Sequence, residues 1–154
     1  MNQTCEIVHF MEILAHRINA CLEFADPKHY AKALALRDLI RKVAPLYDIL
    51  VQTDVLVYEG QEILFNRMSD LHTDIQDPHL GWAILAVLGS HKGGHLYLPH
   101  LELRVRLKPG DIIFLCGRVV PHQVEEWTGQ RISVPHFTHS SMWRALGKYK
   151  VFVV

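Results

Sequence analysis

Three residues have the types and spacing that a mononuclear iron(II) centre requires: His72, Asp74 and His122. Two imidazoles and one carboxylate hold such an ion on one face and leave its other coordination positions open. Those positions suit the keto acid end of 2-oxoglutarate and a molecule of dioxygen. On a β-strand, side chains two residues apart point the same way, so His72 and Asp74 are expected to reach one ion. We therefore expect an oxygenase site that uses Fe(II), 2-oxoglutarate and O2, with these three residues as its catalytic centre.

A cation follows the second histidine. Arg131 is expected on the strand after His122, and Ser133 should share its face. A guanidinium binds a carboxylate by a fork of charge-assisted hydrogen bonds, so both residues are expected to bind the far carboxylate of 2-oxoglutarate. Zinc also accepts two histidines and an acid, and it is the competing metal. Arg131 favours iron, because a hydrolytic zinc site needs no neighbouring buried cation. A structural cluster without metal is the remaining alternative.

Helices and then strands are expected to position these residues. Apolar residues at helical spacing predict one helix capped by Thr4 and a second from Asp26-Pro27 to Pro45. Short β-like runs begin at about Val55, separated by turn residues that include Gly93-Gly94 and Thr128-Gly129. The expected strands are Val55–Tyr58, Gln61–Asn66, Gly81–Leu88, His95–Leu98, Leu103–Leu107, Asp111–Leu115, His122–Trp127, Arg131–Phe137 and Tyr149–Val154.

Together these elements predict an α+β fold: a double-stranded β-helix (jelly roll) with two N-terminal helices packed on the sheet. The metal-binding pair would follow one strand, and His122 would lie opposite it if the two sheets face each other. We expect a single dioxygenase domain over residues 1–154, with helical support in 1–45 and the jelly-roll core in 55–154.

Composition restricts the classes of protein to be considered. The chain has 154 residues, with 16 basic and 16 acidic side chains, which argues against a strongly electropositive nucleic-acid binder. Three scattered cysteines, Cys5, Cys21 and Cys116, are expected to be reduced, buried thiols of an intracellular protein. The longest apolar stretch, around Leu80 to Gly89, is too short to span a bilayer, so no membrane partner is expected.

From about residue 60 to residue 143 the chain resembles the iron(II)/2-oxoglutarate-dependent dioxygenases. It is most similar to the TET/JBP group, and to its small fungal members in particular. The resemblance is carried by His72-Thr73-Asp74, by His122 and by the run from Arg131 to His139. It implies oxidation of the methyl group of 5-methylcytosine or thymine in nucleic acid, hence a role in DNA modification and a nuclear location.

The same resemblance assigns further site residues. Arg67 would lie near the cosubstrate and Asp77 would face the target base, while Phe137 would stack on that base and His139 would hydrogen-bond to it. An enzyme can react with a base in a duplex only after the base has left the helical stack, which costs free energy. Stacking of the base on an aromatic side chain recovers about 1–3 kcal/mol of that free energy. Core packing for Phe137 and a capped strand end for His139 are the ordinary alternatives. Apolar residues around Trp82, Leu85 and Leu96 would keep the pocket dry.

Two other functions remain open. One is a protein hydroxylase of the prolyl type, which would need no stacking platform at Phe137. The other is a jelly-roll binding module that has lost catalysis. If the substrate is nucleic acid, DNA is favoured over RNA, but the strand state is undecided, because Arg104, Arg106, Lys108 and Arg118 are either a local basic patch or a solvated strand face. The oligomeric state is not predicted.

Overall fold

The computed structural model describes residue 9 and residues 11–148, which divide into two compact units. One is helical and comprises the described residues up to Glu59 and those from Ser141 onward; the other is a β unit, Gly60–Ser140. The predicted cap at Thr4, the predicted strand at Tyr149–Val154 and Cys5 lie outside the described residues.

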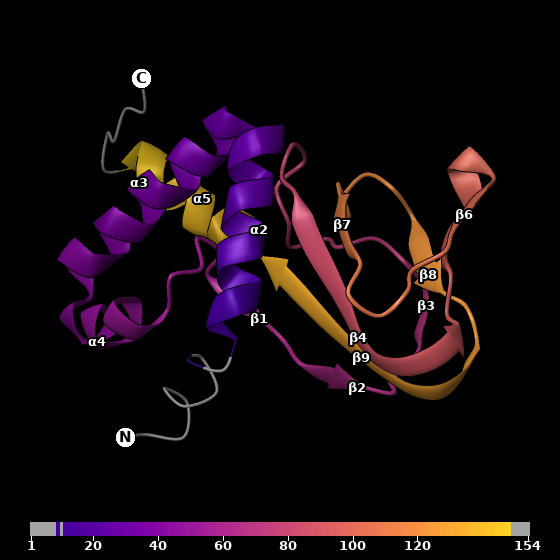
Figure 1. Cartoon of the computed structure of the whole chain (residues 1–154). Coiled ribbons are helices and arrows are strands. Elements are labelled where there is room, and N and C mark those ends of the chain that lie inside the picture. Colours follow the sequence, from indigo (N-terminus) through magenta and orange to yellow (C-terminus); the bar gives the residue numbers. More distant parts are fainter. Residues whose placement is uncertain (1–8, 10, 149–154) are drawn as a thin grey trace. The chain divides into compact units, whose positions relative to one another are not determined.

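The helical unit contains α2 (Glu12–Ala25), α3 (Pro27–Val43), α4 (Pro45–Thr53) and most of α5 (Ser140–Lys148) (Figure 1). As predicted, Asp26 caps α3, because its carboxylate accepts a hydrogen bond of 2.9 Å from the His29 N–H. The prediction that Pro45 ends the second helix missed α4, since proline also fits the first turn of a new helix. Helix α5 was not predicted from the sequence. No described helix is long and apolar enough to cross a membrane.

The core of the helical unit forms where α3 meets α5. Leu36, Leu39 and Ile40 are buried, and Met142 and Trp143 pack against them. The expectation of buried cysteines is wrong for Cys21, which is exposed on α2, and Cys116 of the β unit is only half-buried. Helical periodicity placed Cys21 beside the buried Leu22, but the apolar face of α2 is narrower than the sequence suggested.

The strand predicted at Val55–Tyr58 is not a strand. These residues follow α4 as an irregular segment in which Leu56, Val57 and Tyr58 are buried. Side chains of the helices satisfy its backbone: Asn19 donates to the Val55 carbonyl at 2.7 Å and accepts from the Val57 N–H at 3.1 Å. Arg37, itself buried, donates to the carbonyls of Asp54 and Leu56. Buried backbone groups need partners, and here side chains supply what a neighbouring strand would have supplied.

The β unit consists of two antiparallel sheets. The first has the order β1-β9-β4-β7, with β2 also paired to β9, and the second has the order β3-β8-β5-β6. The strands are β1 (Gly60–Gln61), β2 (Leu64–Phe65), β3 (Ser69–His72), β4 (Ala83–Gly93), β5 (Leu96–Leu98), β6 (Leu103–Val105), β7 (Ile112–Leu115), β8 (His122–Val124) and β9 (Trp127–Phe137), and a 3-10 turn (Pro99–Leu101) joins β5 to β6. Five of the predicted runs contain one of these strands in full, and two more overlap β4 and β9, whereas β3 was not predicted as a strand.

Strands β4 and β9 form the long ribbon at the centre of the first sheet and lie side by side in Figure 1. They pair continuously from Ile84↔His136 to Gly93↔Trp127. The prediction of a turn at Thr128-Gly129 is therefore wrong, because both residues lie within β9. Gly129 has a φ of +90° and lies against the backbone of β4, so this glycine permits close pairing of the strands rather than a reversal of the chain.

One hydrophobic cluster joins the inner faces of the two sheets. Val87 comes from the first sheet, Leu96, Leu98 and Val124 come from the second, and Leu107 follows β6. The sheets therefore pack face to face over a common core.

Candidate metal centre

The two candidate histidines lie on neighbouring strands of one sheet. His72 is the last residue of β3 and His122 is the first residue of β8, and the two are register partners. The expectation that His122 would lie opposite on the facing sheet is wrong. Asp74 lies beyond the end of β3, where its N–H donates to the Gly117 carbonyl at 2.9 Å. A loop contact, rather than strand alternation, therefore positions the carboxylate.

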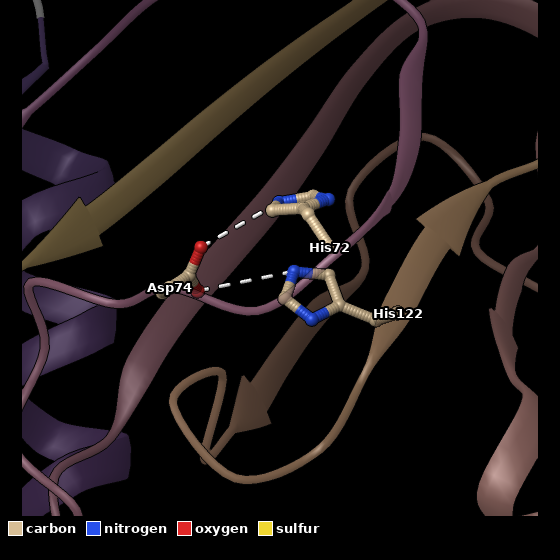
Figure 2. A group of neighbouring side chains, drawn as sticks. All are labelled: His72, Asp74 and His122. Carbon is tan, nitrogen blue, oxygen red and sulfur yellow. Dashed lines mark ion pairs between the residues drawn. The ribbon is translucent and has the colours of Figure 1, made fainter.

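The three side chains converge on one point, as Figure 2 shows. His72 Nε2 lies 3.5 Å from Asp74 Oδ1, and His122 Nε2 lies 3.8 Å from Asp74 Oδ2. One potential ligand atom from each residue lies within 4.8 Å of the others. Two imidazole nitrogens and one carboxylate oxygen at this separation are a donor set that suits Fe(II) and leaves coordination positions open.

Backbone carbonyls orient both imidazoles. His72 Nδ1 lies 2.7 Å from the Asp70 carbonyl, and His122 Nδ1 lies 2.9 Å from the Val120 carbonyl. Because a carbonyl only accepts, each Nδ1 carries a proton, which leaves each Nε2, on the side of Asp74, as the atom available to a metal ion. This is the arrangement in which histidines bind metals, with the second nitrogen anchored to the protein.

His122 is also kept neutral by its surroundings. Burial lowers its pKa, and the neighbouring His72 lowers it further, while the Val120 carbonyl and Asp74 act in the opposite direction. A neutral imidazole is the form that binds a metal ion, so a lowered pKa favours metal binding near neutral pH.

Arg131 is a charged residue that is almost completely buried in the β unit. Its side chain is 1% exposed, and Nη1 donates to the Ser133 hydroxyl. Gly94 leaves room for the guanidinium, since a Cβ there would lie 3.0 Å from Arg131 Nε, and the Trp127 ring centroid lies 5.6 Å from Arg131 Cζ. Within the part of the chain that the structure describes, Nε and Nη2 have no hydrogen-bond partner. Burial lowers the pKa of Arg131, but a guanidinium remains charged. A buried cation with two free donors fits a carboxylate ligand.

One cavity of about 480 Å³ connects most of the predicted site residues. Besides the metal-binding candidates, its lining includes Arg67, Asp77, Ser133, Phe137 and His139. Arg131 does not line the cavity, but its Nη1 donates a hydrogen bond to the hydroxyl of Ser133, which does.

The apolar wall of the cavity was predicted in part. Leu85 and Leu96 line it as expected, together with Leu115 and Val124. Trp82 does not line it and instead lies edge-on to Phe114, with 6.3 Å between the ring centroids. Strands from both sheets therefore contribute apolar side chains to the lining of the cavity.

Phe137, His139 and Asp77 form a second cluster in the same cavity. The rings of Phe137 and His139 are 4.8 Å apart between centroids, and His139 Nδ1 lies 3.5 Å from Asp77 Oδ1. Asp77 is buried, and its N–H donates to the Asp74 carbonyl at 2.9 Å. Burial and the nearby Asp74 raise the pKa of Asp77, and His139 opposes that shift. The cluster offers an aromatic face beside a polar edge.

Some residues that shape the site were not found from the sequence. Asn66, which has a φ of 49°, exchanges two hydrogen bonds of 2.8 Å with the Arg131 backbone and fixes β2 to β9. Gly60 lies against Phe137 and Gly117 lies against Asp74, so a side chain at either would collide with a site residue. Tolerance of asparagine for positive φ was a usable signal for Asn66, whereas the role of the two glycines depends on contacts between distant parts of the chain.

Comparison with known proteins gives the family. No curated protein sequence matches the chain. Among solved structures, it is similar to NgTET1 in complex with 5mC DNA, with a TM-score of 0.53 and 17% sequence identity over 85% of this chain and 62% of that one. At this identity the likeness shows the fold alone, and this chain spans less than two thirds of the NgTET1 chain. The model of the Tet/JBP family, the oxygenase domain of the 2OGFeDO superfamily, matches residues 2–140. Because that match spans most of the chain, the protein belongs to the Tet/JBP family of the 2OGFeDO superfamily.

Proposed function

We propose that this protein is an Fe(II)- and 2-oxoglutarate-dependent dioxygenase that oxidises the methyl group of 5-methylcytosine or thymine in DNA. One observation carries the proposal: the metal-binding candidates and the cluster of Asp77, Phe137 and His139 line the same cavity. Metal ligands alone would fit many substrates. An aromatic face with a polar edge beside those ligands suits a planar base that has left its stack.

We also propose that the β unit is a double-stranded β-helix, or jelly roll. From β2 onward, consecutive strands alternate between the two sheets except for the paired β5 and β6, and the sheets have the orders β1-β9-β4-β7 and β3-β8-β5-β6. This supports eight-stranded jelly-roll connectivity with β2 as an addition to the first strand. We assign both units to one domain. The family match over residues 2–140 supports this assignment, because it includes residues of both units.

In this proposal His72, Asp74 and His122 hold Fe(II). The bound ion, with 2-oxoglutarate and dioxygen, would supply the oxidising power that converts a methyl group to a hydroxymethyl group, with succinate and carbon dioxide as the other products. Arg131 and Ser133 bind the far carboxylate of 2-oxoglutarate: the Ser133 hydroxyl lines the cavity, and the Arg131 guanidinium, which donates to that hydroxyl, supplies the positive charge. Arg67, exposed at the cavity lining, assists at the cosubstrate.

The remaining residues act on the substrate. Phe137 stacks on the flipped base, while His139 and Asp77 hydrogen-bond to its polar edge. Leu85, Leu96 and Val124 exclude water from the reacting groups. The 5mC DNA in the NgTET1 complex supports DNA as the substrate class. Action on genomic DNA would place the protein in the nucleus of a cell that has one.

The decisive experiment is incubation of the iron-loaded protein with 2-oxoglutarate, ascorbate and matched DNA and RNA oligonucleotides, with and without 5-methylcytosine, in single-stranded and duplex form. Nucleoside mass spectrometry should find a product that contains one more oxygen atom than the methylated base, and succinate should form in equal amount. Oxidation of proline-containing peptides instead of oligonucleotides would favour the protein hydroxylase. Metal binding without succinate formation on any substrate would favour the binding module.

A further inference from the structure

We propose that Gly117 is a positioning residue of the candidate metal centre: its missing side chain provides the space in which the Asp74 carboxylate lies. The inference rests on the proposed function, because it takes Asp74 as a metal ligand. It adds a residue without any ligand atom of its own to the set on which metal binding depends.

Gly117 lies close to both the backbone and the side chain of Asp74. The Asp74 N–H donates to the Gly117 carbonyl at 2.9 Å, which brings the two backbones together. A Cβ on Gly117 would lie 1.9 Å from Asp74 Oδ2 and 2.9 Å from Asp74 Cγ. Oδ2 is the oxygen that lies 3.8 Å from His122 Nε2. A methyl group at position 117 would therefore take the place of the oxygen that faces the second histidine.

Backbone conformation does not account for this glycine. Positive φ angles, which favour glycine, occur at Gly89, Gly93, Gly94, Gly110 and Gly129. Gly117 is not in that group, so its backbone conformation is open to alanine. The three nearest atoms to an added Cβ all belong to the Asp74 side chain. The requirement for glycine is thus steric and specific to the proposed ligand.

The turn that contains Gly117 also orients His122. The Cys116 carbonyl accepts hydrogen bonds from Val119 N–H at 2.9 Å and from Val120 N–H at 3.0 Å. The Val120 carbonyl in turn lies 2.9 Å from His122 Nδ1. Because these hydrogen bonds hold the turn, Gly117 cannot retreat from Asp74 without disturbing the second ligand. One short turn between β7 and β8 therefore positions two of the three proposed ligands.

An added methyl group should move the carboxylate and leave the fold intact. The Asp74 side chain is 32% exposed and lines the cavity, so it has room to rotate away. Gly117→Ala should consequently fold like the parent but present its carboxylate in the wrong place. Changes to residues that orient metal ligands typically cost about 10–100-fold in metal affinity.

The test uses Co(II) as a spectroscopic probe of the metal-free 154-residue chain. Gly117→Ala should bind Co(II) at least about tenfold more weakly than the parent by calorimetric titration, with altered visible absorption bands. Its melting temperature without metal should stay close to that of the parent. Gly60→Ala is the matched control: Gly60 also lacks a positive φ, and its added Cβ would lie 2.2 Å from the Phe137 ring rather than from a ligand. This control should bind Co(II) like the parent.

Affinity and absorption bands in Gly117→Ala that equal those of the parent would overturn the inference, while the metal site itself would stand. Failure of the parent to bind Co(II) would instead reject the metal-site assignment on which the inference rests. If Gly117→Ala alone does not fold, the double variant Asp74→Ala/Gly117→Ala decides. Recovery of the fold in the double variant would locate the clash at Asp74, and continued failure to fold would overturn the inference.

Discussion

His72 and His122 are register partners on the adjacent antiparallel strands β3 and β8, and their ring centroids are 4.3 Å apart. Two residues far apart in the sequence are thus brought together by strand pairing alone. The register shifts between Ser69 and His72, an irregularity of the kind that redirects a side chain near a functional site. A slip of one residue between the strands would turn one imidazole to the opposite face, so the register of a short strand pair determines whether the site exists.

Asp74→Ala should abolish tight metal binding, because two neutral imidazoles alone neither neutralise the ion nor complete the ligand set. We expect a loss of about 100-fold or more in Fe(II) affinity, measured by anaerobic titration. Asp70→Ala is the control: the Asp70 side chain is exposed, and the Asp70 carbonyl that contacts His72 Nδ1 remains in the variant. Stoichiometric iron in Asp74→Ala would reject the ligand assignment.

Arg131→Met should change stability and cosubstrate binding in opposite directions. The buried guanidinium has two unused donors among the described residues, so an apolar chain of similar length should raise the unfolding free energy of the metal-free protein by about 1 kcal/mol or more. Loss of the charged hydrogen bonds should weaken 2-oxoglutarate binding by about tenfold to hundredfold.

Thermal unfolding with Ni(II), with and without 2-oxoglutarate, measures both effects of Arg131→Met. Without 2-oxoglutarate, the variant should have a higher melting temperature than the parent. Addition of 2-oxoglutarate should raise the melting temperature of the variant only slightly. Arg106→Met, at an exposed position, should behave like the parent in both respects. A destabilised variant that still responds fully to 2-oxoglutarate would contradict the assigned role of Arg131.

The sequence identified residues that converge in the folded chain, but it did not predict the geometry by which they meet. Residue types and spacing were enough to select His72, Asp74 and His122, because few other arrangements of these groups make chemical sense on a β-rich chain. The sequence could not show that Asp74 leaves the strand and is held by Gly117, since that contact joins segments distant in the chain. Local patterns carry no information on such pairings.

The errors in the fold have a similar cause. The apolar residues of Val55–Tyr58 predict a strand, but side chains of Asn19 and Arg37 form the hydrogen bonds with its backbone that a neighbouring strand would form. These contacts exist only once the helices have folded. Thr128-Gly129 reads as a turn, but strand β4 pairs across it. In both places tertiary contacts override a local preference that is weak on its own.

Phe137→Ala should weaken binding of a 5-methylcytosine oligonucleotide by about tenfold to hundredfold, because base–aromatic stacking is worth about 1–3 kcal/mol. Phe137→Trp should keep most of the affinity, since it preserves the aromatic face. Fluorescence anisotropy with a labelled single-stranded oligonucleotide measures the effect. Phe24→Ala removes a ring that is 92% exposed on α2 and should leave the affinity unchanged. Equal affinities in parent and Phe137→Ala would remove the support for a base-stacking role.

His136 should make the protein sensitive to mild acid. Its ring is fully buried, with Nδ1 3.2 Å from the Ile84 carbonyl and Nε2 2.8 Å from Gln61 Nε2, and burial lowers its pKa from 6.5 to about 4. Between these two values the unfolded chain binds a proton that the folded protein does not. Stability should therefore be unaffected by this group above about pH 6.5 and should fall as the pH decreases toward about 4, by at most about 1.4 kcal/mol per pH unit.

His136→Gln tests this pH dependence, because an amide can donate to the Ile84 carbonyl and accept from Gln61 but does not titrate. Urea unfolding at several pH values between about 7 and 4 should show a shallower loss of stability in the variant than in the parent. His100→Gln, which replaces an exposed histidine, should keep the slope of the parent. Equal slopes in His136→Gln and the parent would mean that the buried ring does accept a proton in the folded protein, contrary to the effect that its burial predicts.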